Sequence, residues 1–182
     1  MNPMADVTGK QAGLSMIEVL VTLVILMVGL LGLAGLQMQG LRSEMESYQR
    51  VQALILLQDM VGHINANRTN AATYIASDIG TTTTADCTTL AVGQPRDICE
   101  WSDALKGASE KSAGAASVGA IIGGRGCITQ LATDTYQISV AWQGLGRTFV
   151  PTNTCGQNAY GGDDALRRVV SLTIRIADLT AP

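Results

Sequence analysis

The chain has 182 residues and a formal net charge of −3 at pH 7. This length allows one ordinary domain plus an appended segment. The acidic balance disfavours a nucleic-acid-binding protein, which usually carries a basic stripe. The chain has a single histidine, His63, which excludes any two-histidine metal site.

An apolar run from Leu14 to Leu36 dominates the N-terminal part of the sequence, and Glu18 is its only charged residue. As an α-helix this run would be roughly 34 Å long, enough to span a bilayer core. A carboxylate within it costs about 2.5–3.5 kcal/mol at mid-membrane and less nearer the interface. Glu18 is therefore a candidate functional residue that needs a partner.

The apolar run is not typical of an ordinary secretory signal peptide. Such a signal has a shorter apolar stretch, of about 7–15 residues, followed by a small-residue cleavage site. Here the polar residues Gln37 and Gln39 follow the run directly, and the one small-residue junction lies before it, at Gly13.

The six residues from Gly13 to Glu18 (Gly-Leu-Ser-Met-Ile-Glu) resemble the class III signal of type IV prepilins and pseudopilins. In that family a membrane peptidase cuts after the glycine and methylates the new amino terminus. The resemblance implies cleavage between Gly13 and Leu14, N-methylation of Leu14, and charge pairing between subunits through Glu18. Two features depart from the family pattern: Leu14 stands where Phe is most usual, and Asp6 offsets the single leader lysine, Lys10.

The resemblance also implies where the protein lies and what it meets. Residues 1–13 would be a cleaved cytoplasmic leader, and residues 14–36 would span the bacterial inner membrane and later form the filament core. The remainder would be periplasmic, and on the pilus or cell surface after assembly. The implied partners are the prepilin peptidase, other minor pilins, the major pilin, the inner-membrane assembly platform and a large tip adhesin.

We expect the helix to continue through residues 37–66 as an amphipathic half. Its apolar residues recur at three- and four-residue steps in two neighbouring stripes, Leu41, Met45, Tyr48, Val51 and Ile55, and Leu54, Leu57, Val61 and Ile64. Asn65 and Asn67 indicate its end. A head formed by residues 67–182 is expected to pack against this half.

All four cysteines, Cys87, Cys99, Cys127 and Cys155, follow the apolar run, and none is in a Cys-x-x-Cys pair. On an oxidising side of the membrane such widely spaced cysteines form disulfides. Three pairings are possible, and the sequence alone does not choose among them. As a hypothesis, local order favours Cys87–Cys99 and Cys127–Cys155.

The segment 97–105 is predicted to form a short helix. Asp97 is placed as its N-cap, with Glu100 three positions on, as in a capping box. Ile98, Trp101 and Leu105 would share one face. This pattern after a cysteine is similar to the head of the minor pilins called PilV, the pilus modification proteins.

Three strands are expected in the C-terminal part: 127–131, 136–142 and 169–176. Apolar residues alternate with polar ones in the second and third, which indicates an antiparallel sheet with one face buried on the long helix. Asp134 is expected to form the turn between the first two. The predicted fold is therefore α+β and pilin-like, with a long N-terminal helix, a small sheet and disulfides.

Candidate catalytic and metal-binding residues are few. His63 is the only possible histidine base, and a partly solvated surface histidine is the stronger interpretation. Asp163 and Asp164 could contribute to a calcium loop, but the EF-hand spacing is absent, which favours a solvated loop. The sequence predicts no enzyme, no cofactor and no metal.

The sequence thus resembles a minor pilin, a structural subunit of a type IV pilus. The resemblance implies a role in assembly initiation and the tip complex, supporting adhesion and twitching motility. Two alternatives stay open. One is a minor pseudopilin of a type II secretion system, and the other is a single-pass periplasmic binding protein or adhesin.

Overall fold

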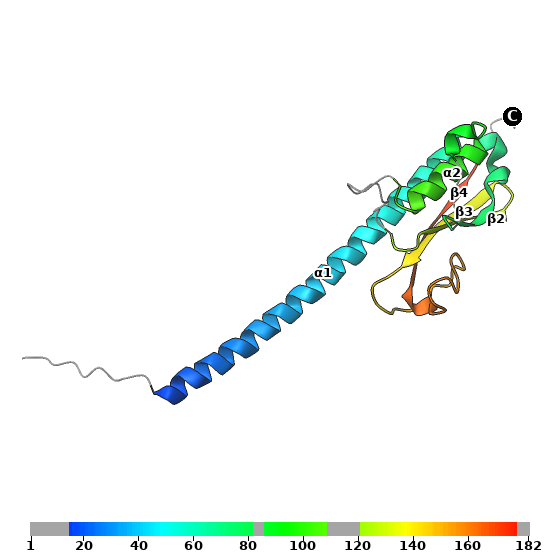
Figure 1. Cartoon of the computed structure of the whole chain (residues 1–182). Helices are drawn as coiled ribbons and strands as arrows, with labels where there is room; N and C mark the ends of the chain where they lie inside the picture. The colour runs from blue at the N-terminus through cyan, green and yellow to red at the C-terminus, as the bar shows by residue number, and fades with distance from the viewer. Residues whose placement is uncertain (1–14, 82–85, 109–120, 178–182) are drawn as a thin grey trace, which may run out of the picture. The chain divides into compact units, whose positions relative to one another are not determined.

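The computed structural model describes residues 15–81, 86–108 and 121–177. The elements along the chain, shown in Figure 1, are α1 (Met16–Ala66), η1 (Arg68–Tyr74), β1 (Ala76–Ile79), η2 (Cys87–Thr89), α2 (Gln94–Leu105), β2 (Arg125–Ala132), β3 (Thr135–Gln143), η3 (Asp164–Leu166) and β4 (Arg167–Arg175). The predicted α+β fold, with a long helix, an antiparallel sheet and two disulfides, is confirmed. The chain divides into two compact units, Met1–Arg42 and Ser43–Pro182.

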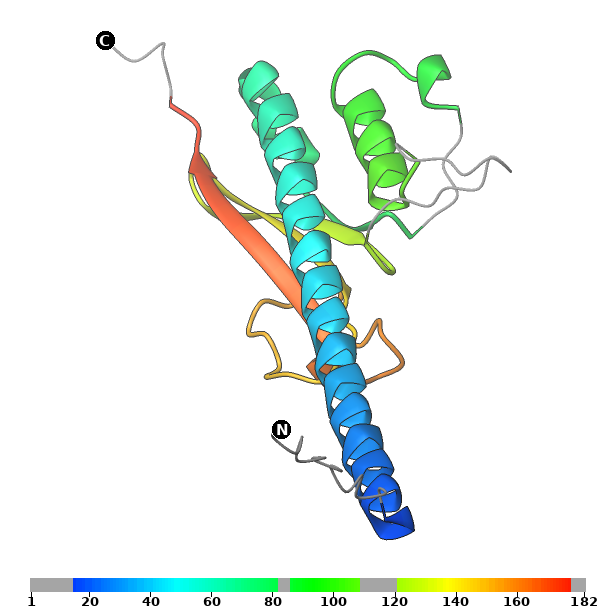
Figure 2. The same ribbon diagram turned by 90° about the vertical axis from the view of Figure 1, so that its left-hand side faces the viewer.

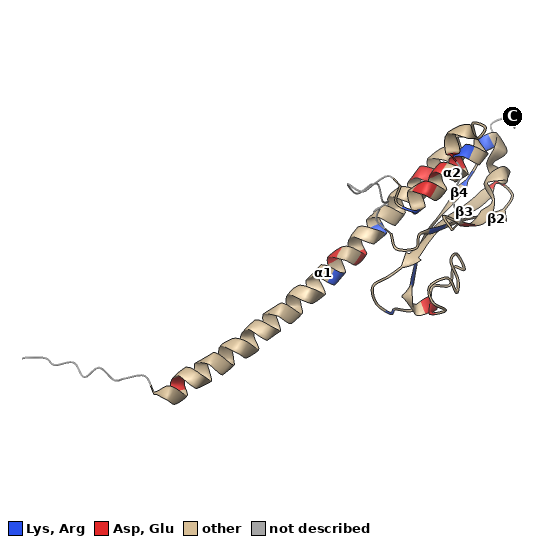
Figure 3. Cartoon of the chain, viewed as in Figure 1, with Lys and Arg blue, Asp and Glu red and all other residues tan. Residues whose placement is uncertain are grey.

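The described part of the first unit is the N-terminal portion of α1. Its side chains are exposed on all faces, and the helix is long and apolar enough to cross a membrane. Figure 3 shows this portion almost free of charged residues. A helix that is apolar all round requires lipid or other helices around it.

The second unit contains the sheet, in the order β1-β2-β3-β4, with each neighbouring pair antiparallel. The C-terminal part of α1 and α2 lie on one face of this sheet (Figure 2). The core between these layers is built from one face of α1, the apolar face of α2 and alternate residues of the strands, including Leu57, Met60, Ile64, Trp101, Leu105, Ile128, Ile138 and Val140.

The packed face of α1 only partly matches the two expected stripes. In the second stripe Leu57 and Ile64 are buried and Val61 packs against the core, whereas Leu54 is 41% exposed. The buried residues are Gln49, Ala53, Leu57, Met60 and Ile64. The first predicted stripe is wrong: its five residues, from Leu41 to Ile55, are each about half exposed. Apolar residues occupy more than one face of this helix, so a hydrophobic pattern does not show which face is packed. The face that approaches the sheet carries the small side chain of Ala53.

The N-cap predicted for α2 is also wrong. The helix begins at Gln94, three residues before Asp97, and its N-cap is Gly93. Gly93 has a φ of 105°, which glycine adopts without strain, and Pro95 lies in the first turn, where its missing N–H costs nothing. Trp101 and Leu105 are fully buried, as expected of their shared face.

The sheet has a fourth strand that the sequence analysis missed. β1 has only four residues, so its alternation is too short to recognise. The turn at Asp134 is confirmed, with a φ of 54°. β3 is buried on both faces from Ser139 to Trp142, because the long connection after it folds back over the outer face and places Cys155 against Ala141.

Candidate functional site

The predicted processing site lies just before the first described residue, Ser15. Gly13 and Leu14, on either side of the expected cleavage, lie outside the described residues. Ser15 precedes α1, and the backbone N–H of Glu18 donates to the Ser15 carbonyl at 3.0 Å, with Ser15 Oγ at 3.4 Å. The Ser-x-x-Glu spacing is that of a capping box, a signal the sequence analysis did not use here. Ser15 therefore fixes where the helix begins, and Glu18 lies in its first turn.

The Glu18 carboxylate has no ion-pair partner in residues 15–81, 86–108 and 121–177. Its side chain is exposed in a helical stretch whose other residues up to Leu36 are uncharged. A cation that pairs with it must come from outside the described residues, either from the first residues of the same chain or from another molecule.

The two disulfides hold loops of the head. Cys87 is bonded to Cys99, which ties η2 to α2, and Cys127 is bonded to Cys155, which ties β2 to the connection between β3 and β4. This is the pairing that local order along the chain favours. Each bond should stabilise the head by about 3 kcal/mol by restricting the unfolded chain.

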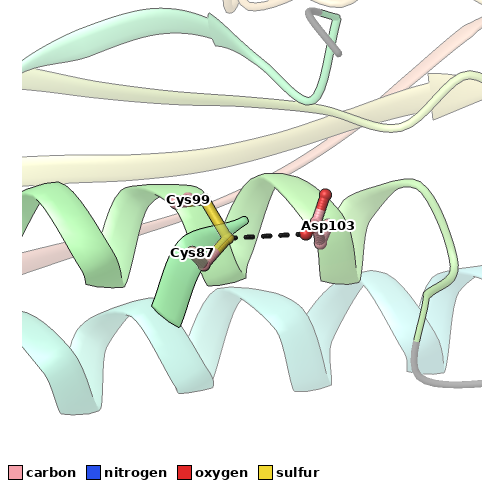
Figure 4. Close-up of side chains that lie close together, drawn as sticks. All are labelled: Cys87, Cys99 and Asp103. Atoms are coloured by element: carbon pink, nitrogen blue, oxygen red, sulfur yellow. Dashed lines mark hydrogen bonds between the residues drawn. A yellow bond between two sulfur atoms is a disulfide. The ribbon is translucent and has the colours of Figure 1, made fainter. Parts of the chain in front are cut away.

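Asp103 lies beside the first disulfide (Figure 4). Its Oδ2 is 3.5 Å from Cys87 Sγ, and the carboxylate and both sulfurs come within 4.8 Å of one another. Metals bind thiolates, whereas these sulfurs are bonded to each other. The trio is therefore not a metal site while the disulfide is intact.

Arg167, the first residue of β4, is buried against the long β3–β4 connection. Its guanidinium is only 1% exposed and donates to the carbonyls of Pro151, Asn153 and Cys155. Its Nε donates to Asp164 Oδ1 at 3.2 Å. A buried charge is tolerated when it is paired and its donors are satisfied, as they are here. The sequence analysis missed this residue, because a single arginine at the start of a strand gives no distinctive signal.

The two candidate calcium ligands are engaged by protein groups. Asp164 pairs with Arg167, and the Asp163 carboxylate pairs with Arg147 and accepts from the backbone N–H of Ala165. Asp163 therefore caps η3 rather than extending into a solvated loop. The interpretation as a purely solvated loop is corrected accordingly.

His63 joins the end of α1 to α2. Its Nδ1 lies 3.3 Å from Asp97 Oδ1, and its Nε2 lies 3.8 Å from Asp59 Oδ2. The Tyr74 hydroxyl donates to the other oxygen of Asp97 and accepts from Asn67 at 3.2 Å. Burial, and then the hydrogen bond to Asp97, raise the pKa of Tyr74 to about 12.

The structure does not bring these candidate residues together. The acids beside His63 are on α1 and α2, whereas Asp163 and Asp164 pair with arginines of the β3–β4 connection and β4. A second arginine, Arg168, contacts Glu46 of α1 at 3.0 Å and links the sheet to the helix. These contacts hold elements of the head together.

Two family models match the chain. The model for the prokaryotic N-terminal methylation motif matches residues 8–34, and the model described as type IV pilin Tt1218 matches residues 35–104. Neither the curated proteins nor the solved structures contain a match. The first match covers the predicted cleavage site and most of the apolar run, and the second extends to α2. The two matches, which together cover residues 8–104, support a type IV pilin-like family and a pilin subunit that carries a prepilin signal.

Proposed function

We propose that the protein is a minor pilin of the PilV type, which joins other minor pilins in starting pilus assembly and lies at or near the tip. The observation that carries the proposal is the head segment that contains α2. Cys99 bonds it to η2, and Trp101 and Leu105 are fully buried against α1 and the sheet. This is the segment whose sequence resembles the PilV head.

Processing is the first step of the proposed function. Residues 1–13 are the leader, and the peptidase cuts between Gly13 and Leu14 and methylates Leu14. Residues 14–36 then anchor the subunit in the inner membrane and later lie in the filament core, residues 37–66 carry the head, and residues 67–182 form it. The uncovered apolar side chains of α1 up to Leu36 support this division.

Glu18 has a separate role in assembly. Cleavage leaves a cationic amino group on Leu14, four residues before Glu18, and the carboxylate pairs with this group on a neighbouring subunit. At about 4 Å and an effective dielectric near 20 the attraction is roughly 4 kcal/mol, much of it offset by desolvation. The absence of a cation beside Glu18 among the described residues supports a partner from outside.

The same assignment implies where the protein lies in the cell and which proteins it contacts. The leader is cytoplasmic and the head is periplasmic, where disulfides persist. The peptidase, the assembly platform, the major pilin, other minor pilins and a large tip adhesin are the proposed partners. Adhesion and twitching motility depend on the protein indirectly, through the number of filaments.

Deletion of the gene tests the proposal. We expect few or no surface filaments, although the major pilin accumulates in the inner membrane, and the wild-type gene should restore them. The Gly13→Val variant is the matched control, because it should remain as uncleaved precursor and fail to restore filaments. Normal piliation in the deletion strain, with secretion of a folded periplasmic enzyme lost, would instead identify a type II secretion pseudopilin.

A further inference from the structure

The strand β4 lies at an open edge of the sheet (Figure 2). Its nine residues pair with β3 in an unbroken register, from Thr135 opposite Arg175 to Gln143 opposite Arg167. No strand among the described residues pairs with its other side. β4 therefore presents a long, regular edge.

The register fixes which backbone groups face outward. The Ile176 N–H donates to the Asp134 carbonyl and the Gly144 N–H donates to the Leu166 carbonyl, both at 2.8 Å. Because ladder bonds in an antiparallel pair recur at every second residue, the even-numbered residues of β4 bond to β3. The outward N–H and C=O groups are those of Val169, Ser171, Thr173 and Arg175.

Within the described residues, β4 lacks the features that usually prevent an edge strand from pairing. Between Val169 and Ile174 there is no proline, no charged residue and no bulge. The opposite edge differs, because β1 has four residues and its register with β2 is irregular. Of the two edges, only β4 offers a continuous template for another strand.

The side chain of Leu172 gives a second, independent indication. Leu172 is opposite Ile138, which is fully buried, so both belong to the face of the sheet that carries the core. Even so, Leu172 is 44% exposed. The alternation of apolar and polar residues in this strand predicts that Leu172 is buried. Its side chain is exposed instead, because no strand among the described residues lies beyond β4. A fifth strand would cover it.

We propose that β4 receives an extended segment of another protein as a fifth strand of this sheet. Main-chain bonds to the four outward positions supply the affinity, and alternate apolar side chains of the segment cover Leu172. An acidic residue of the segment pairs with Arg175, whose side chain is exposed. The proposal does not depend on the position of the subunit in a filament.

Charge argues against a second copy of this chain as the occupant. Two copies of β4 related by a two-fold axis at Ser171 would place the exposed Arg175 of each copy opposite the buried Arg167 of the other, which already pairs with Asp164, so neither copy would offer Arg175 an acidic partner. A different segment, uncharged in the middle and acidic opposite Arg175, matches this edge better.

Amide hydrogen exchange on the full mature chain in detergent micelles tests the proposal. The probe is a synthetic peptide of about nine residues that alternates Val and Thr and carries Glu at both ends. We expect it to slow exchange at Val169, Ser171, Thr173 and Arg175 by about tenfold or more, with little change at Leu172 and Ile174, which already bond to β3. A peptide of the same composition with two central prolines is the control and should protect none of them.

Substitutions at Ser171 locate the effect on the edge. Ser171→Pro removes one outward N–H at a position where an edge strand tolerates proline, and it should abolish protection by the peptide. Ser171→Thr keeps the N–H and should retain it. Fast exchange at Leu172 in the Ser171→Pro variant would mean that β4 has detached from β3. In that case the Leu172→Lys variant is tested instead, and it should weaken peptide binding while the β3–β4 bonds stay intact.

Three results would overturn the proposal. The four amides could remain fast at millimolar peptide, or the proline-containing control could protect them equally. They could also be slow without any peptide. In that case, protection that grows with protein concentration would identify self-pairing, and protection independent of concentration would mean that the chain covers its own edge.

Discussion

The indole N–H of Trp101 donates to the backbone carbonyl of Leu56 at 2.7 Å, which joins α2 to the C-terminal part of α1. The ring is fully buried and lies over Gly126 of β2. A Cβ built on Gly126 would be 2.2 Å from Trp101 Cζ3. The absence of a side chain at Gly126 is therefore what allows α2 to pack this closely against the sheet beside the long helix.

The first prediction concerns this close approach. Gly126→Ala should destabilise the head by about 1–3 kcal/mol, because the ring or the strand must shift to admit the methyl group. Gly146→Ala is the matched control, since nothing lies within 4 Å of its Cβ, and it should change stability by less than about 0.5 kcal/mol. Urea unfolding followed by tryptophan fluorescence measures both. Equal effects of the two variants would contradict the account of Gly126.

The second prediction concerns the buried arginine. Arg167→Met should cost about 3–5 kcal/mol, because it leaves Asp164 and three backbone carbonyls without their donor. Arg147→Gln is the control, because Arg147 lies in the β3–β4 connection with its side chain 73% exposed. This substitution should cost less than about 1 kcal/mol. Denaturant titration measures the loss, and limited proteolysis should show faster cleavage between Gly144 and Asp163 in the Arg167 variant alone.

The third prediction concerns alkaline pH. Burial raises the pKa of Tyr160 to about 12 from an ordinary value of 10.0, and the pKa of Tyr74 to the same value. The folded state therefore keeps these protons at pH values where the unfolded chain has lost them. Their contribution to stability is complete below pH 10 and is lost as the pH rises towards 12. The Tyr74→Phe and Tyr160→Phe variants should each show a smaller fall in the urea midpoint between pH 9 and pH 11 than the wild type. An identical fall in all three proteins would refute this assignment.

Much of this fold could be predicted from local pattern. The long helix, the alternating strands β3 and β4 and the turn at Asp134 depend on periods of 3.6 and 2 and on turn chemistry, which short stretches of sequence contain. The packed face of α1 could be predicted only in part, because it also depends on Ala53 and Gln49 meeting a sheet formed much later in the chain. The N-cap at Gly93 was missed because Asp97 matches the more common N-cap pattern.

The candidate site was predicted unevenly for the same reason. Gly13, Leu14 and Glu18 form a contiguous motif, so the sequence identifies them, although their roles stay predictions. Arg167 donates to backbone carbonyls 12 to 16 residues away in the chain, and no pattern of residue types predicts such contacts. The open edge of β4 likewise depends on the order of strands in the sheet.

The fourth prediction separates processing from assembly. Glu18→Ala should be cleaved after Gly13 and yet fail to co-purify with other minor pilins from detergent-solubilised membranes, because the carboxylate that pairs with the neighbouring amino group is gone. Glu18→Gln is the matched variant that keeps the shape and should fail equally. Gly13→Val should leave full-length precursor. If Glu18→Ala co-purifies with these partners at wild-type yield and supports normal piliation, the charge-pairing role is wrong.

The fifth prediction is the most direct test of the proposed place of the protein as a minor pilin. Filaments are sheared from cells, and the amount of mature chain, beginning at methylated Leu14, is measured by mass spectrometry against isotope-labelled peptides of this protein and of the dominant subunit. The account predicts that the methylated chain is present in the filament fraction at a small fraction of the dominant subunit. An amount equal to the dominant subunit, or the absence of the chain from filaments that form normally, would contradict it.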